Sequence, residues 1–161
     1  MKRIIGWLGI AAFWVLWPVW FVYFKRHNQR SRVLIICNGE VLLVRGILGS
    51  SARWSLPGGG RKAGESAESA VVREVKEEVG IIIEESALKP MGSHRHPGYG
   101  IAYVADYFVV ELSEKPEVLL QPMEILYAHW WPLHEVRGRI LQQDAAYGLK
   151  HYEPARQETL L

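Results

Sequence analysis

The chain has 161 residues, with 19 Lys and Arg against 17 Asp and Glu, a length that allows one substantial domain and excludes two full ones. Six of the basic residues lie within residues 1–32, which hold no acid, so the remainder carries 13 basic and 17 acidic residues and a net charge of −4. A body of that sign lacks the clustered Lys and Arg that displace counterions from DNA or RNA, so we expect no nucleic-acid polymer among its partners.

An uncharged, apolar run spans residues 4–24, in which only two glycines and a proline lack an apolar side chain. As a helix, this run reaches about 31 Å, the thickness of the hydrocarbon core of a bilayer. Large aromatic residues lead straight into Lys25 with no small-residue cleavage site, so a removed signal peptide is not expected. The sequence therefore predicts one transmembrane helix within an amino-terminal anchor, residues 1–26, that has basic flanks.

Charge on either side of this run predicts the orientation of the anchor. Lys2, Arg3 and the terminal amine precede the run, and four Lys and Arg follow it within residues 25–32. The positive-inside rule then places the following domain in the cytoplasm. The basic stretch also suits contact with anionic lipid headgroups. We thus expect a single-pass membrane protein that contacts the membrane through its amino-terminal helix.

Two apolar, β-branched runs, residues 33–37 and 41–44, flank the dipeptide Asn38-Gly39. This dipeptide is typical of the tight turn of a β-hairpin, so the domain is expected to open with two paired strands. The single cysteine of the chain, Cys37, excludes an internal disulfide. Its place at the end of the first run favours a small buried apolar residue over a reactive thiol.

A glycine-rich loop and a helix follow the hairpin. Residues 54–56 lead into Pro57 and a run of three glycines, where proline ends any strand and glycine permits unusual backbone angles. The valines of residues 66–79 recur on one side at 100° per residue, which predicts a helix with one apolar stripe. Gly80 ends this helix.

Alternating and apolar runs in the second half predict further strands and a helix. We expect a long strand over 101–112, a loop over 114–122, a strand over 129–132 and an amphipathic helix over 133–142. Strands, a helix, more strands and a last helix, in that order, indicate an α/β domain, residues 27–150, whose helices pack on a mixed sheet. A polar tail is expected over residues 151–161.

Three carboxylates, those of Glu74, Glu77 and Glu78, share one face of the predicted helix beside its valine stripe. Like charges this close repel and raise one another's pKa unless a cation neutralises them. Hard divalent ions take oxygen ligands, so this face favours Mg²⁺ or Mn²⁺. Taken alone, the three glutamates also suit a solvated face on which Arg73 and Glu77 form an i,i+4 pair.

The spacing around these residues resembles the Nudix box, G-x5-E-x7-R-E-U-x-E-E-x-G-U, in which U is aliphatic. Gly59 is followed after five residues by Glu65 and after seven more by residues 73–81, and no specified position departs from the pattern. The residues before the box resemble the strand and turn that usually enter it, and residues 124–133 resemble the family's closing strand and helix start. The resemblance covers about residues 32–142 and implies a Nudix-type α/β/α sandwich around a mixed sheet.

The resemblance also implies an activity. The family hydrolyses, with a divalent metal, a nucleoside diphosphate linked to another moiety, so Mg²⁺ or Mn²⁺ is the implied cofactor and a small nucleotide the implied substrate. Glu74 and Glu78 are implied metal ligands, with Glu77 a further ligand and the carbonyl of Gly59 another.

Other positions are implied to act beside these ligands. Arg73 orients a neighbouring glutamate through a charge-assisted hydrogen bond, and Glu65, at the start of the helix, fixes the geometry of the loop. The carboxylate that deprotonates the attacking water varies among relatives. Glu74 or Glu77 ranks first for this catalytic role, and Glu124, outside the box, ranks second.

Residues outside the box are expected to choose the substrate. Pro97 lies at a spacing from the box that resembles Nudix enzymes for ADP-ribose, whereas Tyr99 falls near a tyrosine position of relatives that act on dinucleoside polyphosphates. We take ADP-ribose or a nucleotide sugar as slightly favoured. Candidates for phosphate binding are Arg45, Arg53 and Arg95, and candidates for stacking on a base are Tyr99, Tyr103, Trp130 and Trp131.

Two other functions stay open. A nucleotide-binding sensor would keep the fold without turnover, although all five charged residues of the box are present. A lipid-linked diphosphate is an alternative substrate that only the anchor suggests. A homodimer is likewise left open.

Overall fold

The computed structural model describes residues 28–47, 52–97, 102–122, 124–136 and 138–153. The predicted anchor, the candidate Tyr99 and most of the predicted polar tail lie outside these residues. Within the described part of the chain, no helix combines the length and apolarity needed to cross a membrane.

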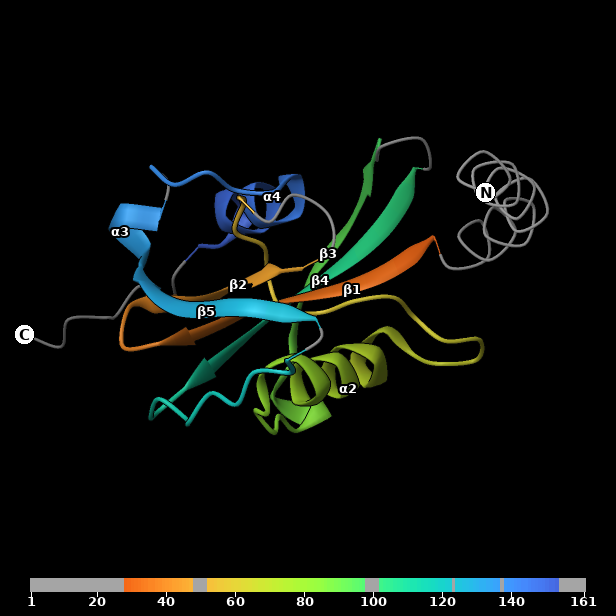
Figure 1. Ribbon diagram of the computed structural model, residues 1–161. Helices are drawn as coiled ribbons and strands as arrows, with labels where there is room; N and C mark the ends of the chain where they lie inside the picture. Colours follow the sequence, from red (N-terminus) through yellow and green to blue (C-terminus); the bar gives the residue numbers. More distant parts are fainter. Residues whose placement is uncertain (1–27, 48–51, 98–101, 123, 137, 154–161) are drawn as a thin grey trace, which may run out of the picture.

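A mixed sheet forms the centre of the domain (Figure 1). Its strands are β1 (Gln29–Cys37), β2 (Glu40–Gly46), β3 (Lys89–His96), β4 (Tyr103–Leu112) and β5 (Ile125–Pro132). They lie in the order β3-β4-β1-β2-β5, with β1 and β4 parallel and the other neighbours antiparallel. The predicted mixed sheet is confirmed, and β1 lies at its centre.

The turn between β1 and β2 forms as the sequence predicts. Asn38 and Gly39 both have positive φ, 50° and 76°, which a two-residue turn of type I′ requires. Cys37 pairs with Glu40 directly before the turn, and its side chain is buried. The predicted hairpin and the predicted burial of the cysteine are both confirmed.

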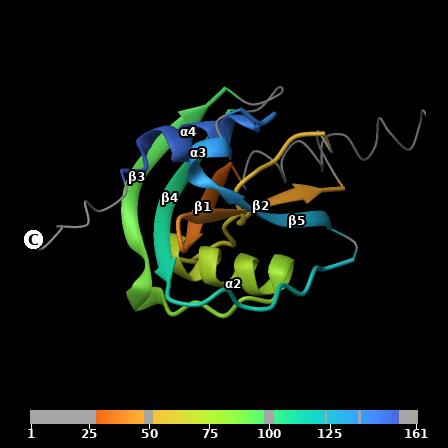
Figure 2. The same cartoon turned by 90° about the vertical axis from the view of Figure 1, so that its left-hand side faces the viewer.

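Helices cover both faces of the sheet. Helix α2 (Ala67–Val79) lies on one face, and α3 (Leu133–Val136) and α4 (Gln143–His151) lie on the other (Figure 2). Because side chains alternate along a strand, β1 sends Val33 into the core on the α2 side and its neighbour Leu34 into the core on the α4 side. The two cores make the predicted α/β/α sandwich.

Helix α2 begins after Ser66 and ends before Gly80, and both residues cap it. The Ser66 hydroxyl accepts a hydrogen bond from the Ser69 N–H at 3.0 Å, which satisfies a free amide of the first turn. At the other end Gly80 takes a left-handed conformation with φ of 71°, and its N–H donates to the Lys76 carbonyl at 3.1 Å. The helix predicted over residues 66–79 is therefore confirmed.

The second predicted helix, residues 133–142, is wrong in its extent. Only Leu133–Val136 is helical in that stretch, and α4 begins at Gln143. The reason is tertiary: the N–H of Trp54 donates to the carbonyl of Ile140 at 3.0 Å, and the N–H of Gln142 donates to that of Trp54 at 2.7 Å. Extended backbone at 140–142 therefore pairs with a distant segment, and α4 forms after it, between the predicted helix and the predicted polar tail.

Strand β3 has no counterpart in the sequence prediction. A short 3₁₀ helix, η1 (Glu85–Ala87), precedes it. Among the described strands it lies at an edge of the sheet and pairs with β4 alone, and of its eight residues only His96 is buried. A strand with so little buried surface carries no alternation of apolar and polar residues, so the hydrophobic pattern gave no signal for it.

A buried ion pair joins α4 to β1. The Nε atom of Arg32 lies 2.8 Å from Oδ2 of Asp144, and the two side chains are 8% and 1% exposed. The same guanidinium donates to the carbonyls of Leu56 and Gly58. The sequence places Arg32 in a basic stretch expected at lipid headgroups, and for this residue the expectation is wrong, because its charge is paired inside the domain.

Replacing Asp144 with alanine should destabilise the domain by about 3–5 kcal/mol, because Arg32 is then buried without its counterion. Alanine at the exposed neighbour Gln143 is the matched control, and its effect should stay within about 0.5 kcal/mol. Urea unfolding of both variants, followed by tryptophan fluorescence, gives the free energies of unfolding. Equal stabilities for the two variants would contradict this role of the ion pair.

Candidate active site

The segment 54–61 enters the sheet between β1 and β2, which pair directly only beside their turn. Ser55 exchanges both of its backbone hydrogen bonds with Val44 of β2, at 2.9 and 3.0 Å. Further along, the N–H of Ser31 in β1 donates to the carbonyl of Gly59 at 2.9 Å. The loop that precedes α2 is thereby fixed to two strands.

Gly58 lies where this loop passes closest to β1. Its φ is +124°, and a Cβ there would lie 3.1 Å from the carbonyl carbon of Ser31 and 3.2 Å from the Cα of Arg32. Only glycine fits such an approach of two backbones. The N–H of Gly58 donates to Oε2 of Glu78 at 2.8 Å, so the approach fixes a carboxylate of α2 against the loop.

Arg73 holds three carboxylates together. Its guanidinium donates to both oxygens of Glu65, at 2.8 and 3.0 Å, to Oε1 of Glu74 at 2.7 Å and to Oε2 of Glu77 at 3.0 Å. A further bond reaches the carbonyl of Gly60 at 3.0 Å. Charge-assisted bonds of this kind are strong and directional, so Arg73 sets the orientation of glutamates on both the loop and the helix.

Glu65 closes the loop before α2. Its Oε2 accepts a hydrogen bond from the N–H of Lys62 at 2.8 Å, in addition to the bonds from Arg73. Hydrogen bonding to Arg73 lowers the pKa of Glu65 to about 2. The carboxylate therefore stays ionised at neutral pH and keeps the loop joined to the helix.

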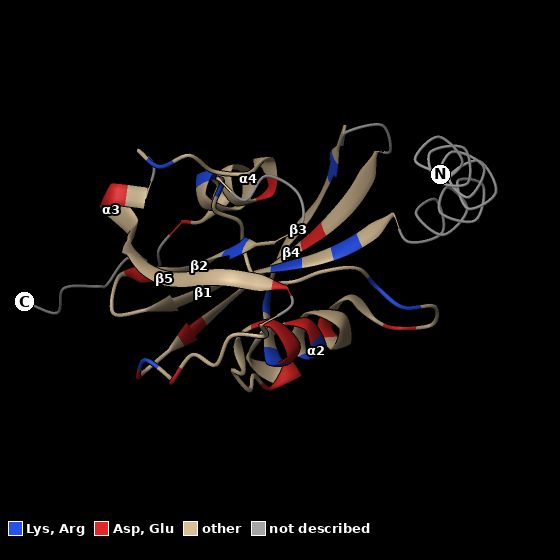
Figure 3. Cartoon of the chain, viewed as in Figure 1, with Lys and Arg blue, Asp and Glu red and all other residues tan. Residues whose placement is uncertain are grey.

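Acidic positions gather along α2 (Figure 3). The carboxylates of Glu74 and Glu78 lie against the loop. A Cβ on Gly59 would overlap the carboxylate of Glu74. Burial raises the pKa of Glu74, and burial raises that of Glu78 to about 7, although Arg32 and the N–H of Gly58 oppose the second shift. The charge of Glu74 adds to the shift of Glu78. These two carboxylates thus share a site with too little positive charge to balance them.

Oxygen donors of this kind fit a hard divalent cation. Glu77 differs from the pair because its side chain is 47% exposed, although the same Nη1 atom of Arg73 donates to both Glu74 and Glu77. Within the described residues, no three His, Cys, Asp or Glu side chains already stand as a metal site. An ion at Glu74 and Glu78 would therefore complete its coordination with other oxygens, such as water or phosphate. The predicted role of the Gly59 carbonyl stays a prediction.

Residues 27–152 match the family model of the NUDIX domain. The chain belongs to the NUDIX domain family. The curated relatives that it resembles include the NAD-capped RNA hydrolase NudC of Pseudomonas entomophila, 34% identical over 116 residues, and Nudix hydrolase 5 of Arabidopsis thaliana, 37% identical over 103 residues. The alignments cover 70% and 61% of this chain but 39% and 33% of those proteins, so the chain spans well under half the length of these relatives.

Solved structures show the same NUDIX fold. The MutT NUDIX hydrolase from Burkholderia pseudomallei superposes with a TM-score of 0.69 at 24% identity and covers 78% of this chain and 97% of its own. The NUDIX domain of Shewanella oneidensis NrtR, solved in complex with ADP ribose, superposes with a TM-score of 0.68 at 19% identity and covers 76% of this chain and 84% of its own. At these identities the likeness establishes the fold.

The described candidates for substrate binding lie on separate elements outside the box. Arg45 lies on β2, where its guanidinium is 5.4 Å from the ring centres of both Trp54 and Tyr127. Arg53 precedes Trp54 in the chain and is partly buried, and Pro97 follows β3 and is exposed. Their proposed contacts with substrate stay predictions.

The aromatic candidates within the described residues already contact other side chains. Tyr103 stacks on His96 with ring centres 5.1 Å apart, and Trp131 meets Trp54 edge-on at 5.6 Å. Trp130 packs against the core on the α2 side. A base would have to displace these contacts or extend them.

Glu124, the second-ranked base, is exposed. Its charge adds a small contribution to the raised pKa of Glu78, in which burial is the largest cause. The side chain therefore lies within electrostatic range of the site. Arg95, in contrast, is exposed on the edge strand β3.

Sequence reasoning missed three charged residues that shape the site. Arg32 connects the loop to α4, and Arg61 donates to Asp106 at 3.1 Å and to the carbonyl of Glu65 at 3.1 Å. Two of them had a signal in the sequence, since Arg32 directly precedes one apolar run and Asp106 interrupts another.

The raised pKa of Glu78 predicts how stability depends on pH when metal is removed by a chelator. The folded-state pKa of about 7 lies above the ordinary value of 4.5, so the folded state holds the proton more tightly, and stability falls as pH rises between these values. Glu78→Gln removes this ionisation and should flatten the decline, as measured by urea unfolding at pH 5 and pH 7.5.

The matched control for this prediction is Glu84→Gln. Glu84 is exposed and makes no side-chain bond at the cap of η1, so its variant should keep the pH dependence of the unmodified chain. If the Glu78→Gln variant also kept that dependence, the carboxylate of Glu78 would not be the group that titrates.

Proposed function

We propose that the chain is a pyrophosphohydrolase acting on a nucleoside diphosphate linked to another moiety, with ADP-ribose or a nucleotide sugar as the favoured class. The observation that carries the proposal is the bonding of Arg73 to Glu65, Glu74 and Glu77 beside the partly buried carboxylate of Glu78. Two names among the relatives support it: one is an NAD-capped RNA hydrolase, and one NUDIX domain was solved with ADP ribose.

A divalent cation, Mg²⁺ or Mn²⁺, is the proposed cofactor. Glu74 and Glu78 would hold it, with Glu77 or the carbonyl of Gly59 as further ligands. When bound, such an ion offsets the negative charge of a diphosphate and makes water more acidic. The ion would also offset the negative charges of Glu74 and Glu78, whose pKa values are raised by burial.

The proposed reaction adds the oxygen of one water to a phosphorus and breaks the bond from that phosphorus to the bridging oxygen, so that two monophosphates leave. Glu77 is placed to accept the proton of the water, because 47% of its side chain is exposed and Arg73 fixes its orientation. Glu74 is the alternative base, but 15% exposure and its bond to Arg73 restrict access to it. Both carboxylates are thus held in place by one guanidinium.

The activity is tested with the full chain in a mild detergent, Mg²⁺, and ADP-ribose, UDP-glucose, diadenosine tetraphosphate and ATP as substrates. We expect release of monophosphates from the first two, a loss of kcat by at least about 100-fold in Glu77→Gln and Glu78→Gln, and no loss in the control Glu84→Gln. A chelator should abolish turnover, and added Mg²⁺ should restore it.

Unchanged turnover in Glu77→Gln and Glu78→Gln would remove both residues from the mechanism. Failure of every substrate, with nucleotide binding retained, would instead identify a NUDIX domain that acts as a sensor.

We also propose that residues 1–26 anchor the domain to a membrane, with the domain in the cytoplasm. The uncharged run of residues 4–24 and the basic residues after it support this orientation. Alkaline carbonate should leave the full chain in membranes, whereas a Val15→Arg variant, charged at mid-run, should be extracted more readily. Added protease should cut the domain in inside-out vesicles only, and cutting in right-side-out vesicles alone would reverse the orientation.

A further inference from the structure

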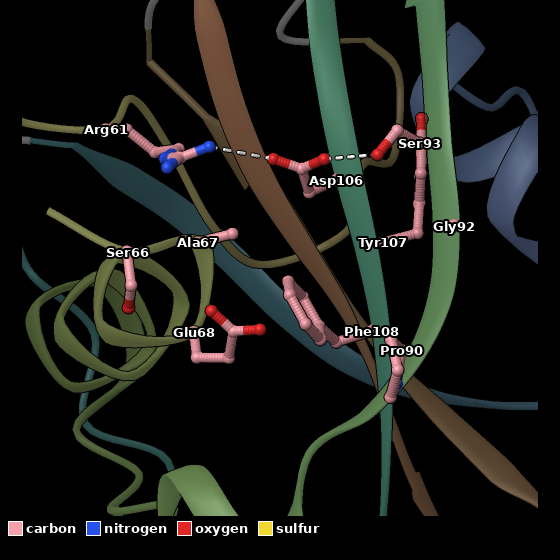
Figure 4. A pocket seen from close by; sticks show the side chains of 10 residues that line it. All are labelled: Arg61, Ser66, Ala67, Glu68, Pro90, Gly92, Ser93, Asp106, Tyr107 and Phe108. Atoms are coloured by element: carbon pink, nitrogen blue, oxygen red, sulfur yellow. Dashed lines mark hydrogen bonds and ion pairs between the residues drawn. The ribbon is translucent and has the colours of Figure 1, made fainter.

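A pocket of about 400 Å³ lies between the start of α2 and the strands β3 and β4 (Figure 4). It is on the same side of the sheet as the carboxylates of the box, but it is lined by other residues. The side chains that matter here are those of Arg61, Ala67, Glu68, Ser93, Asp106 and Phe108.

One part of the pocket wall is apolar. The ring of Phe108 lies beside Glu68 and close to Pro90, and the methyl group of Ala67 points toward the same space (Figure 4). Phe108 is itself 3% exposed and belongs to the core on the α2 side. A ligand in the pocket would therefore rest on a rigid surface.

The opposite part of the wall is polar and already organised. Asp106 accepts hydrogen bonds from Arg61 through Oδ2, at 3.1 Å, and from the Ser93 hydroxyl through Oδ1. Arg61 is held in turn by the carbonyl of Glu65 at 3.1 Å. The Nε atom of Arg61 is buried and has no hydrogen-bond partner among the described residues, so one donor beside the pocket is unsatisfied.

Glu68 differs from the other acids of α2 because no described residue bonds to it. Its carboxylate points toward the space between α2 and β4 (Figure 4). The neighbouring Arg61 is already paired with Asp106. Glu68 thus offers the pocket a carboxylate whose acceptor positions are not used within the described chain.

The charges of the pocket indicate what it binds. Two carboxylates face it against one guanidinium, so a phosphate would be repelled. Acceptors outnumber donors, and one wall is apolar. A neutral ring that carries several hydroxyl groups meets these conditions, because adjacent hydroxyls donate to a carboxylate while the ring carbons cover an apolar surface.

We infer that this pocket binds a sugar ring, and that Glu68 accepts hydrogen bonds from its hydroxyls. The inference rests on the proposed function, in which the sugar is the moiety joined to the nucleotide through the diphosphate. A chain of contacts links the two sites, since Arg61 holds Glu65, Glu65 bonds to Arg73, and Arg73 bonds to Glu74. A sugar held at Glu68 would therefore act as a second point of recognition beside the diphosphate site.

The test compares ADP-ribose with ADP, which lacks the distal sugar, by calorimetry on the full chain in detergent with a chelator present. Binding is then measured without turnover. We expect ADP-ribose to bind about tenfold more tightly than ADP. Glu68→Gln should reduce this ratio to about two and leave the affinity for ADP unchanged, because it removes the charge that accepts the hydroxyls.

Two further variants make the result specific. Ser93→Ala removes a hydroxyl from the opposite wall and should also lower the ratio, whereas Glu84→Gln, an exposed carboxylate outside the pocket, should keep it. Thermal melting checks that each variant is folded. We expect Glu68→Gln to remain folded and to melt only slightly below the unmodified chain, since no described residue bonds to the carboxylate and only its interaction with the start of the α2 dipole is lost.

An unchanged ratio in folded Glu68→Gln would overturn the inference. Equal weakening of ADP and ADP-ribose would overturn it as well, because the pocket would then hold the ribose of the nucleotide itself. A collapsed ratio combined with failure to hydrolyse any substrate would support the pocket and reject the proposed activity. Hydrolysis combined with an unchanged ratio would do the reverse.

Discussion

The burial of Arg32 at the centre of the sheet is the interaction on which the rest of the site depends. Its guanidinium pairs with Asp144 of α4 on one side and donates to the carbonyls of the loop on the other. That loop turns the N–H of Gly58 toward Glu78 of α2. One arginine thus connects the helix on one face of the sheet to the carboxylates on the other, and neither the loop nor Glu78 is positioned by α2 alone.

Local signals in the sequence correctly predicted the features that depend on neighbouring residues, such as helix caps and turns. Ser66 and Gly80 cap α2, and Asn38-Gly39 makes the hairpin turn, because each depends on a few neighbouring residues. The prediction of the second helix was wrong because Trp54, which is distant in the sequence, forms backbone hydrogen bonds with the residues on either side of Leu141. Those bonds hold this segment in an extended conformation. Strand β3 was not predicted because an exposed edge strand has no hydrophobic pattern to detect. The α/β/α sandwich was predicted from the family resemblance, because the local signals do not determine how the elements pack.

The candidate site was predictable in its membership but not in its division of roles. Helical spacing places Glu74, Glu77 and Glu78 on one face, but it treats them alike. In the fold they differ, because Glu78 is partly buried and accepts a hydrogen bond from the loop, Glu74 lies against the loop and bonds to Arg73, and Glu77 reaches solvent. Those differences come from where the loop crosses β1, which is a tertiary property. Arg45 lies on β2, outside the loop and helix that carry the box, and its contact with substrate stays a prediction.

The position of Glu78 opposes its ionisation in two ways. It lies in the last turn of α2, where the negative end of the helix dipole disfavours a carboxylate, and burial raises its pKa further. Arg32 and the N–H of Gly58 offset only part of this cost. A cation that binds there would gain from relieving the remainder, so the same burial that weakens the metal-free domain strengthens its affinity for a divalent ion. Replacing Glu78 by a neutral residue would then trade metal binding for stability.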